Sequence, residues 1–166
     1  MIKYLIGAAG IAAGLLATSG AMAEDVIRHK TPNSTFPIAR AVEVQADKTT
    51  VYVSGAVPPR VNESADKNSI EAYGDTKTQT VSVLTSIEKT LADLGLKMGD
   101  VVKMQVFLVG DPAKEGTMDF AGFMEGYTQF FGTEEQPNLP ARSVFQVAGL
   151  ANPGYLVEIE VIAVRP

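Results

Sequence analysis

The segment Tyr155–Val164 constrains the fold most, because it is an apolar run of strand length that carries only two charges, Glu158 and Glu160. Alternate residues of a β-strand lie on one face, so both carboxylates are predicted to point the same way, among aliphatic side chains. Glutamates are rarely buried unless they are paired. The pattern therefore predicts a strand whose charged face does more than fill a core.

Arg142 opens the preceding predicted strand, Arg142–Val147, directly after Pro140-Ala141. If the two strands are neighbours, Arg142 could approach one of the glutamates or a ligand held between them. An arginine can bind a carboxylate bidentately, and a glutamate can orient or activate water. The pair predicts a site for a small polar or anionic molecule. A structural Arg–Glu pair at a subunit interface is the alternative, and spacing alone does not separate the two.

The N-terminal residues have the pattern of a secretory signal peptide. A basic start, Met1-Ile2-Lys3, is followed by an apolar stretch to Leu16 and by the small-residue site Ala21-Met22-Ala23. The apolar stretch is shorter than the roughly 20 residues that span a bilayer. We therefore expect cleavage after Ala23 and a periplasmic or secreted protein with no membrane contact after cleavage. An uncleaved membrane anchor is the alternative.

The composition excludes several classes of function. The net charge of −5 becomes one unit more negative when Lys3 is removed, and the chain has no basic run, so nucleic-acid binding is not expected. The chain has no cysteine and one histidine, His29, so neither a zinc site nor a Ser-His or Cys-His nucleophile is expected. No metal or other cofactor is predicted.

The predicted element order is β-β-α-β-α-β-β, in the α/β (α+β) class. A flexible lead-in over residues 24–36 precedes a hairpin, a long loop, two helices and three further strands. The ranges are Ile38–Val44 and Thr50–Val53 for the hairpin, Pro58–Asp75 for the loop, Asp75 to about Leu94 and Thr117–Phe131 for the helices, and Val101–Val109, Arg142–Val147 and Tyr155–Val164 for the strands. The simplest arrangement is one mixed sheet with both helices on one face. The uncovered face retains apolar residues, which predicts an oligomer.

Two short motifs, Pro140-Ala141-Arg142-Ser143 and Leu156–Arg165, resemble the RidA/YjgF family, also called endoribonuclease L-PSP. Val53-Ser54-Gly55 and the stretch from Leu94 to Phe107 extend the resemblance, which covers nearly all of a domain at residues 37–166. The resemblance implies a chorismate-mutase-like domain that assembles as a homotrimer with ligand sites between subunits. It also implies hydrolysis of small enamine or imine compounds to ammonia and a 2-keto acid, without a cofactor.

The resemblance also implies roles for individual residues. Arg142 corresponds to the arginine that binds the substrate carboxylate, and Glu158 corresponds to the glutamate that places the attacking water. Backbone groups near Gly55 and Val144 would line the same cleft. Ser54, before Gly55, could belong to a strand-end turn or offer its backbone N–H to a ligand.

Two positions depart from the family pattern, because Ile38 and Met124 stand where deaminase members usually carry a tyrosine and an asparagine. A non-catalytic module that binds small carboxylates in the same cleft is therefore the alternative to a hydrolase. Ribonuclease activity, suggested by the second family name, has the least support, because the chain is acidic and offers no His, Lys or metal constellation. The functions of Glu160 and of the Pro58–Asp75 loop are left open.

Overall fold

The computed structural model describes residues 25–166, so the predicted signal peptide lies outside the described residues. Six strands form a four-stranded sheet in the order β3-β6-β4-β5 and a separate two-stranded sheet, β1-β2. The strands are β1 (Val26–His29), β2 (Ala41–Val44), β3 (Thr50–Ala56), β4 (Val101–Val109), β5 (Ala141–Val147) and β6 (Val157–Val164). Only β4 and β5 run parallel, so the sheet is mixed, as predicted.

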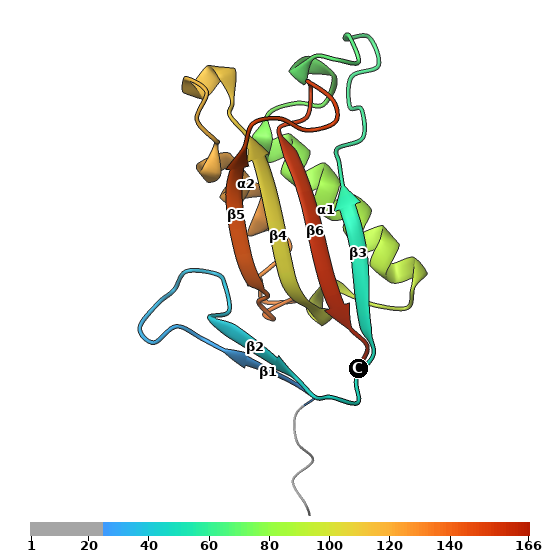
Figure 1. The fold of residues 1–166 in the computed structure, drawn as a ribbon, viewed down its shortest axis with the longest axis vertical. Coiled ribbons are helices and arrows are strands. Elements are labelled where there is room, and N and C mark those ends of the chain that lie inside the picture. The colour runs from blue at the N-terminus through green and yellow to red at the C-terminus, as the bar shows by residue number, and fades with distance from the viewer. Residues whose placement is uncertain (1–24) are drawn as a thin grey trace, which may run out of the picture.

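Both helices cover the same face of the four-stranded sheet (Figure 1). Helix α1 (Thr76–Asp93) begins where predicted, because the Asp75 side chain accepts a hydrogen bond from the Thr78 backbone N–H at 2.8 Å. It ends before Gly95, whose φ of +72° favours glycine. The predicted α+β class, with two helices on one face of a mixed sheet, is confirmed.

The core lies between the helices and this sheet face. On and just after α1, Val81 is only half-buried and Leu94 is exposed. The fully buried side chains come from α1, α2 and the central strands β4 and β6, and they include Leu84, Ile87, Leu91, Met104, Val106, Leu108, Phe123, Tyr127, Ile159 and Val161.

The predicted hairpin between Ile38–Val44 and Thr50–Val53 is wrong. Strand β2 pairs with β1, which lies inside the segment predicted to be a flexible lead-in, whereas β3 pairs with β6. His29 Nε2 lies 2.7 Å from Glu43 Oε1 across the β1–β2 ribbon, and Arg28 Nη2 donates to the Gly99 carbonyl at 2.8 Å. Strand pairing depends on such distant partners, which a local turn signal does not reveal.

Helix α2 (Phe120–Tyr127) is shorter than the predicted Thr117–Phe131. It begins late because the Asp119 side chain caps it by accepting from the Gly122 backbone N–H at 3.1 Å. Gly126 allows α2 to approach the neighbouring helix, since a Cβ there would lie 2.8 Å from Thr80 Cβ of α1. Gly126 therefore permits close packing of α2 against α1.

Among the described elements, no helix covers the other face of the four-stranded sheet, which we call the open face (Figure 1). Tyr52 is 77% exposed there and Phe145 is 48% exposed. The Phe107 and Phe145 rings stack with centroids 6.3 Å apart. The prediction of an uncovered face with apolar residues is confirmed. None of the helices that the structure describes is both long and apolar enough to cross a membrane.

Candidate functional site

Arg142 lies at the start of β5 and points toward α2, where aromatic rings surround its guanidinium. Its Cζ atom lies 4.1 Å from the ring centroid of Tyr127, 5.0 Å from that of Phe123 and 5.6 Å from that of Phe36. All three are within cation–π distance. Nη2 donates to Met124 Sδ at 3.2 Å, and the buried Nη1 has no hydrogen-bond partner within the described chain. A thioether accepts weakly, so the guanidinium retains donor capacity for an anion.

Burial dominates the electrostatics of the aromatic cluster formed by Arg142 and the three rings. Desolvation lowers the pKa of Arg142, and the neighbouring Tyr127 partly offsets that effect. Desolvation likewise raises the pKa of Tyr127 to about 12, although Arg142 opposes the shift. The Tyr127 hydroxyl donates to the Pro37 carbonyl at 2.9 Å. At neutral pH Tyr127 is therefore neutral. Arg142 carries a positive charge, because arginine titrates far above pH 7.

The segment before β2 packs beside the start of β5, next to Arg142. Ala39 forms an isolated parallel bridge with Ala141, and its backbone N–H donates to the Pro140 carbonyl at 3.0 Å. The bridge places the half-buried Ile38 beside the start of β5. Val144 lies on the same face of β5 as Arg142, because the two residues are separated by two positions.

Glu158 lies on the open face and packs against the backbone of β3. A Cβ at Gly55 would lie 3.0 Å from Glu158 Cδ and closer still to Oε1, so only glycine leaves room for this carboxylate. The register of β3 and β6 shifts between Val53 and Ala56, which takes Ser54 and Gly55 out of regular pairing. Such a bulge re-aims backbone groups, so Glu158 faces an irregular strand end with an exposed Ser54.

The sequence analysis allowed Arg142 to approach a glutamate, or a ligand between the two residues, if their strands were neighbours, and this condition is not met. Strand β4 lies between β5 and β6. Met104 is opposite Arg142 on β5, whereas Phe107 is opposite Glu158 on β6. Residues 104 and 107 have opposite parity, so the two side chains lie on opposite faces of the sheet. Gly55 and Arg142 also belong to opposite edge strands, β3 and β5.

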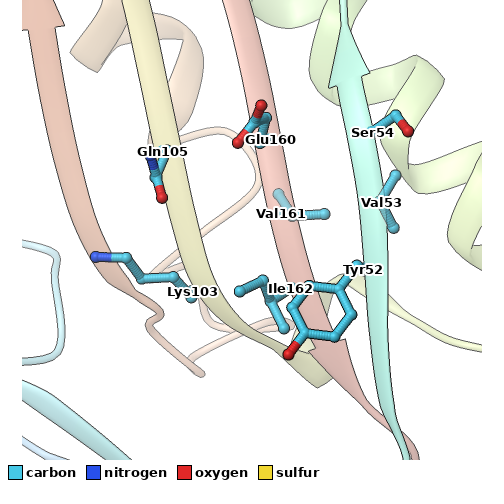
Figure 2. A pocket seen from close by; sticks show the side chains of 8 residues that line it. All are labelled: Tyr52, Val53, Ser54, Lys103, Gln105, Glu160, Val161 and Ile162. Carbon is cyan, nitrogen blue, oxygen red and sulfur yellow. The ribbon is translucent and has the colours of Figure 1, made fainter.

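Glu160 lies in a separate hollow of about 370 Å³ on the open face (Figure 2). Figure 2 shows its carboxylate between β4 and β3, next to Gln105, its register partner on β4. Lys103 and Ser54 also line the hollow, and Lys103 Nζ lies 3.4 Å from Ser143 Oγ. A second hollow of the same size runs along the β3 edge, past Ser54 and Gly55 to α1. The β3 edge is therefore indented on both sides of Ser54.

Metal chemistry finds no support in the part of the chain that the structure describes. No three His, Asp or Glu side chains there lie close enough together to hold a metal ion. His29 lies in the β1–β2 ribbon, where its Nε2 is paired with Glu43 Oε1.

Comparison with known proteins identifies the family. The family model described as Endoribonuclease L-PSP matches residues 30–165. The chain belongs to this family, which is the RidA/YjgF family that its motifs resemble. A putative reactive intermediate deaminase, TdcF, of Escherichia coli K12 is 33% identical to it over 82% of this chain and 92% of the relative. The 2-iminobutanoate/2-iminopropanoate deaminase of the same organism is 31% identical over 87% and 99% of the two chains.

Solved structures support the same fold. The crystal structure of Escherichia coli TdcF with bound serine matches with a TM-score of 0.55 and 31% identity, covering 86% of this chain and 99% of the other. A putative endoribonuclease of Thermotoga maritima matches with a TM-score of 0.53 and 30% identity over 87% and 99% of the chains. These relatives establish family and fold, and their printed names concern deamination of imines in some cases and ribonuclease activity in others.

Sequence reasoning missed the three rings around Arg142. Phe36 lies in the segment predicted to be a flexible lead-in, and Phe123 and Tyr127 lie in the second predicted helix. Helical periodicity indicates that a ring faces inward, but not which charged group it meets there. Met124, which departs from the family pattern in the sequence, is in contact with Arg142 in the structure.

Proposed function

We propose that this chain is a RidA-type hydrolase of small carboxylated imines and enamines, acting outside the cytoplasm after removal of residues 1–23. The observation that carries the proposal is the Arg142 guanidinium, held by aromatic rings with one buried N–H donor group unpaired. An unpaired charged donor is costly to bury, so an incoming carboxylate would gain both a charge and hydrogen bonds. The deaminase names of relatives around 30% identical support the reaction class.

In the proposed reaction, water adds to the carbon of the C=N bond, which forms a C–O bond and a carbinolamine. One proton of the water moves to nitrogen as the carbinolamine forms. The carbinolamine hydroxyl then gives up the second proton to the same nitrogen, the C–N bond breaks, and ammonia leaves as the C=O bond of the 2-keto acid forms. The Glu158 carboxylate would orient the water and accept its proton, then return the proton to the leaving nitrogen. Arg142 would hold the carboxylate, so that the imine carbon faces this water.

The two residues must come from different subunits in this mechanism. Within one chain they lie on opposite faces and beside opposite edges of the sheet. In a head-to-tail contact, the β5 edge of one subunit meets the β3 edge of the next, so each subunit uses both edges once. Such contacts form a ring if the rotation from one subunit to the next leads back to the first subunit. We propose a homotrimer with three such sites, with the open faces directed inward. Exposed Tyr52 and Phe145 on that face support its burial.

Imine hydrolysis by the mature protein is the direct test. Imino acids would be produced in situ by an amino-acid oxidase and trapped with semicarbazide, so that an imine hydrolase lowers the yield of semicarbazone. We expect the wild type to accelerate hydrolysis, and Arg142→Ala to lower kcat/KM by about 10- to 100-fold, the value of a charge-assisted hydrogen bond. Lack of acceleration by the wild type across small, acidic and aromatic imino acids would refute the hydrolase.

Mixing two inactive variants tests the shared site. Co-expression of Arg142→Ala with Glu158→Gln allows some subunit contacts to combine an intact arginine with an intact glutamate. In a randomly mixed ring, about a quarter of the sites would be wild type, so about a quarter of the activity should return. A site built within one chain would regain nothing. A solution mass equal to one chain would also overturn the ring.

A binding module without turnover is the second candidate. The observation in its favour is that Met124 Sδ, and not an amide, contacts Arg142. Under this reading, 2-keto or amino acids bind to the wild type in calorimetric titration and Arg142→Ala abolishes binding. Glu158→Gln separates the two candidates, because it should remove turnover but spare binding in a hydrolase, whereas a binding module shows no turnover to lose.

A further inference from the structure

Phe36 is the solvent-exposed member of the three rings around Arg142. Its side chain is 45% exposed, whereas Phe123 and Tyr127 are completely buried. The ring lies 5.6 Å from Arg142 Cζ on one side and stacks on Phe120 on the other, with centroids 6.5 Å apart. A phenylalanine that is half open to solvent therefore lies between the surface and the proposed carboxylate anchor.

The backbone around Phe36 is held in place although it belongs to no helix or strand. The Phe36 N–H donates to Ser34 Oγ at 3.2 Å, and its carbonyl accepts from the Ile38 N–H at 2.8 Å. The next carbonyl, of Pro37, accepts from the Tyr127 hydroxyl at 2.9 Å. The ring is therefore positioned before a ligand arrives, which lowers the entropic cost of a contact with it.

We propose that Phe36 makes the site selective for carboxylates with an apolar side chain, either branched aliphatic or aromatic. The inference rests on the proposed function, since it assumes that a carboxylate binds at Arg142. The groups around that anchor are three aromatic rings and the thioether of Met124. A ligand hydroxyl there would lose water without gaining a strong partner. An apolar side chain would instead bury the exposed ring of Phe36.

Phe36 has two effects that can be measured separately. Its cation–π contact with Arg142 influences every ligand that carries a carboxylate, because all of them use the same guanidinium. Its contact with the ligand side chain influences only ligands that have an apolar one. The ratio of kcat/KM between an apolar and a polar substrate cancels the first effect and isolates the second.

The test compares imines derived from leucine and phenylalanine with the imine derived from serine, using the trapping assay. The difference of a few methylene groups in an apolar pocket corresponds to at least about tenfold. We expect the wild type to prefer the leucine-derived over the serine-derived imine by at least that factor, and Phe36→Ser to remove most of the preference. Phe36→Leu, which keeps an apolar rim, should retain it.

A matched control is Val44→Ser, which removes an exposed apolar side chain from β2 in the separate ribbon. It should leave the preference unchanged.

A wild type that hydrolyses the leucine-derived and serine-derived imines equally, or a preference that survives Phe36→Ser, overturns the role of Phe36 while the hydrolase stands. If the wild type hydrolyses none of the three imines, the hydrolase fails, and calorimetric titration with 4-methyl-2-oxopentanoate and 3-hydroxypyruvate decides the inference separately. Tighter binding of the former, lost in Phe36→Ser, supports it; equal binding, or none, overturns it.

Discussion

Substitution of Gly55 by alanine tests whether the position of Glu158 controls the activity. The new methyl group would lie 3.0 Å from Glu158 Cδ and closer to Oε1, whereas ordinary van der Waals contact begins near 3.4 Å. The carboxylate must therefore move, by an amount on the order of 1 Å, which is enough to lower a rate by about 100-fold or roughly 2.7 kcal/mol. Gly55 does not have a positive φ, so the backbone itself tolerates alanine.

The displaced atoms are the far end of a flexible side chain, so the fold should tolerate the change better than the reaction does. We expect Gly55→Ala to lose about 100-fold in kcat/KM in the trapping assay, while Tm falls by no more than a few degrees. Gly149→Ala is the matched control, since a Cβ at Gly149 meets no atom within 4 Å. It should change neither quantity.

A double mutant identifies the mechanism of the loss. If Gly55→Ala acts by moving Glu158, then Gly55→Ala combined with Glu158→Gln should be no less active than Glu158→Gln alone, because residues that act through one group are not additive. Full activity in Gly55→Ala, or losses that multiply in the double mutant, would refute the argument that this close contact positions the carboxylate.

Three further predictions concern stability. Gln79→Leu removes the amide that donates to the Gly74 and Gly154 carbonyls and accepts from the Leu156 N–H, so it should lower the free energy of urea unfolding by about 3 kcal/mol; a loss below about 1 kcal/mol would contradict this. Asp75→Ala removes the cap of α1 and should cost about 1 kcal/mol at pH 7. The hydrogen bond from Thr78 lowers the pKa of Asp75, so this difference should shrink as the pH falls below about 4, and a difference independent of pH would be inconsistent with a charged cap. Burial raises the pKa of Tyr127 to about 12, so its contribution is present below the ordinary tyrosine pKa and is lost as the pH rises toward 12. Thermal unfolding of Tyr127→Phe should accordingly be less sensitive to pH above 10 than that of the wild type.

Local signals predicted the elements whose ends depend on nearby residues. The start of α1 at Asp75 and its end before Gly95 follow from a cap and a glycine, and both contacts are local. The apolar runs predicted β4 and β6 for the same reason. Strand partners were not predictable in this way, because the pairing of β1 with β2 and of β3 with β6 depends on residues outside each strand's local sequence.

The candidate residues of the site follow from the sequence, but their arrangement does not. The strand pattern indicated Arg142 and the two glutamates, the resemblance distinguished Glu158 from Glu160, and the structure places Met124 beside Arg142 and Gly55 beside Glu158. The sequence does not show that β4 separates β5 from β6, nor the strand registers that place Arg142 and Glu158 on opposite faces. The role of Phe36 depends on the Ala39–Ala141 bridge, a contact that no local pattern predicts.

The alternation of side chains along β6 prevents Glu158 from reaching Arg142 within a single chain. Moving Glu158 to the face of Arg142 would require a one-residue shift in β6. Because side chains alternate, that shift would also turn the buried Ile159 and Val161 toward the open face and bring Glu160 into the core. The burial of two aliphatic side chains, about 1.5–3 kcal/mol each, opposes the shift, as does the cost of an unpaired buried carboxylate. The hydrophobic pattern that stabilises the sheet therefore also keeps Arg142 and Glu158 apart within one subunit. A reaction that needs both groups must in consequence use two copies of the chain.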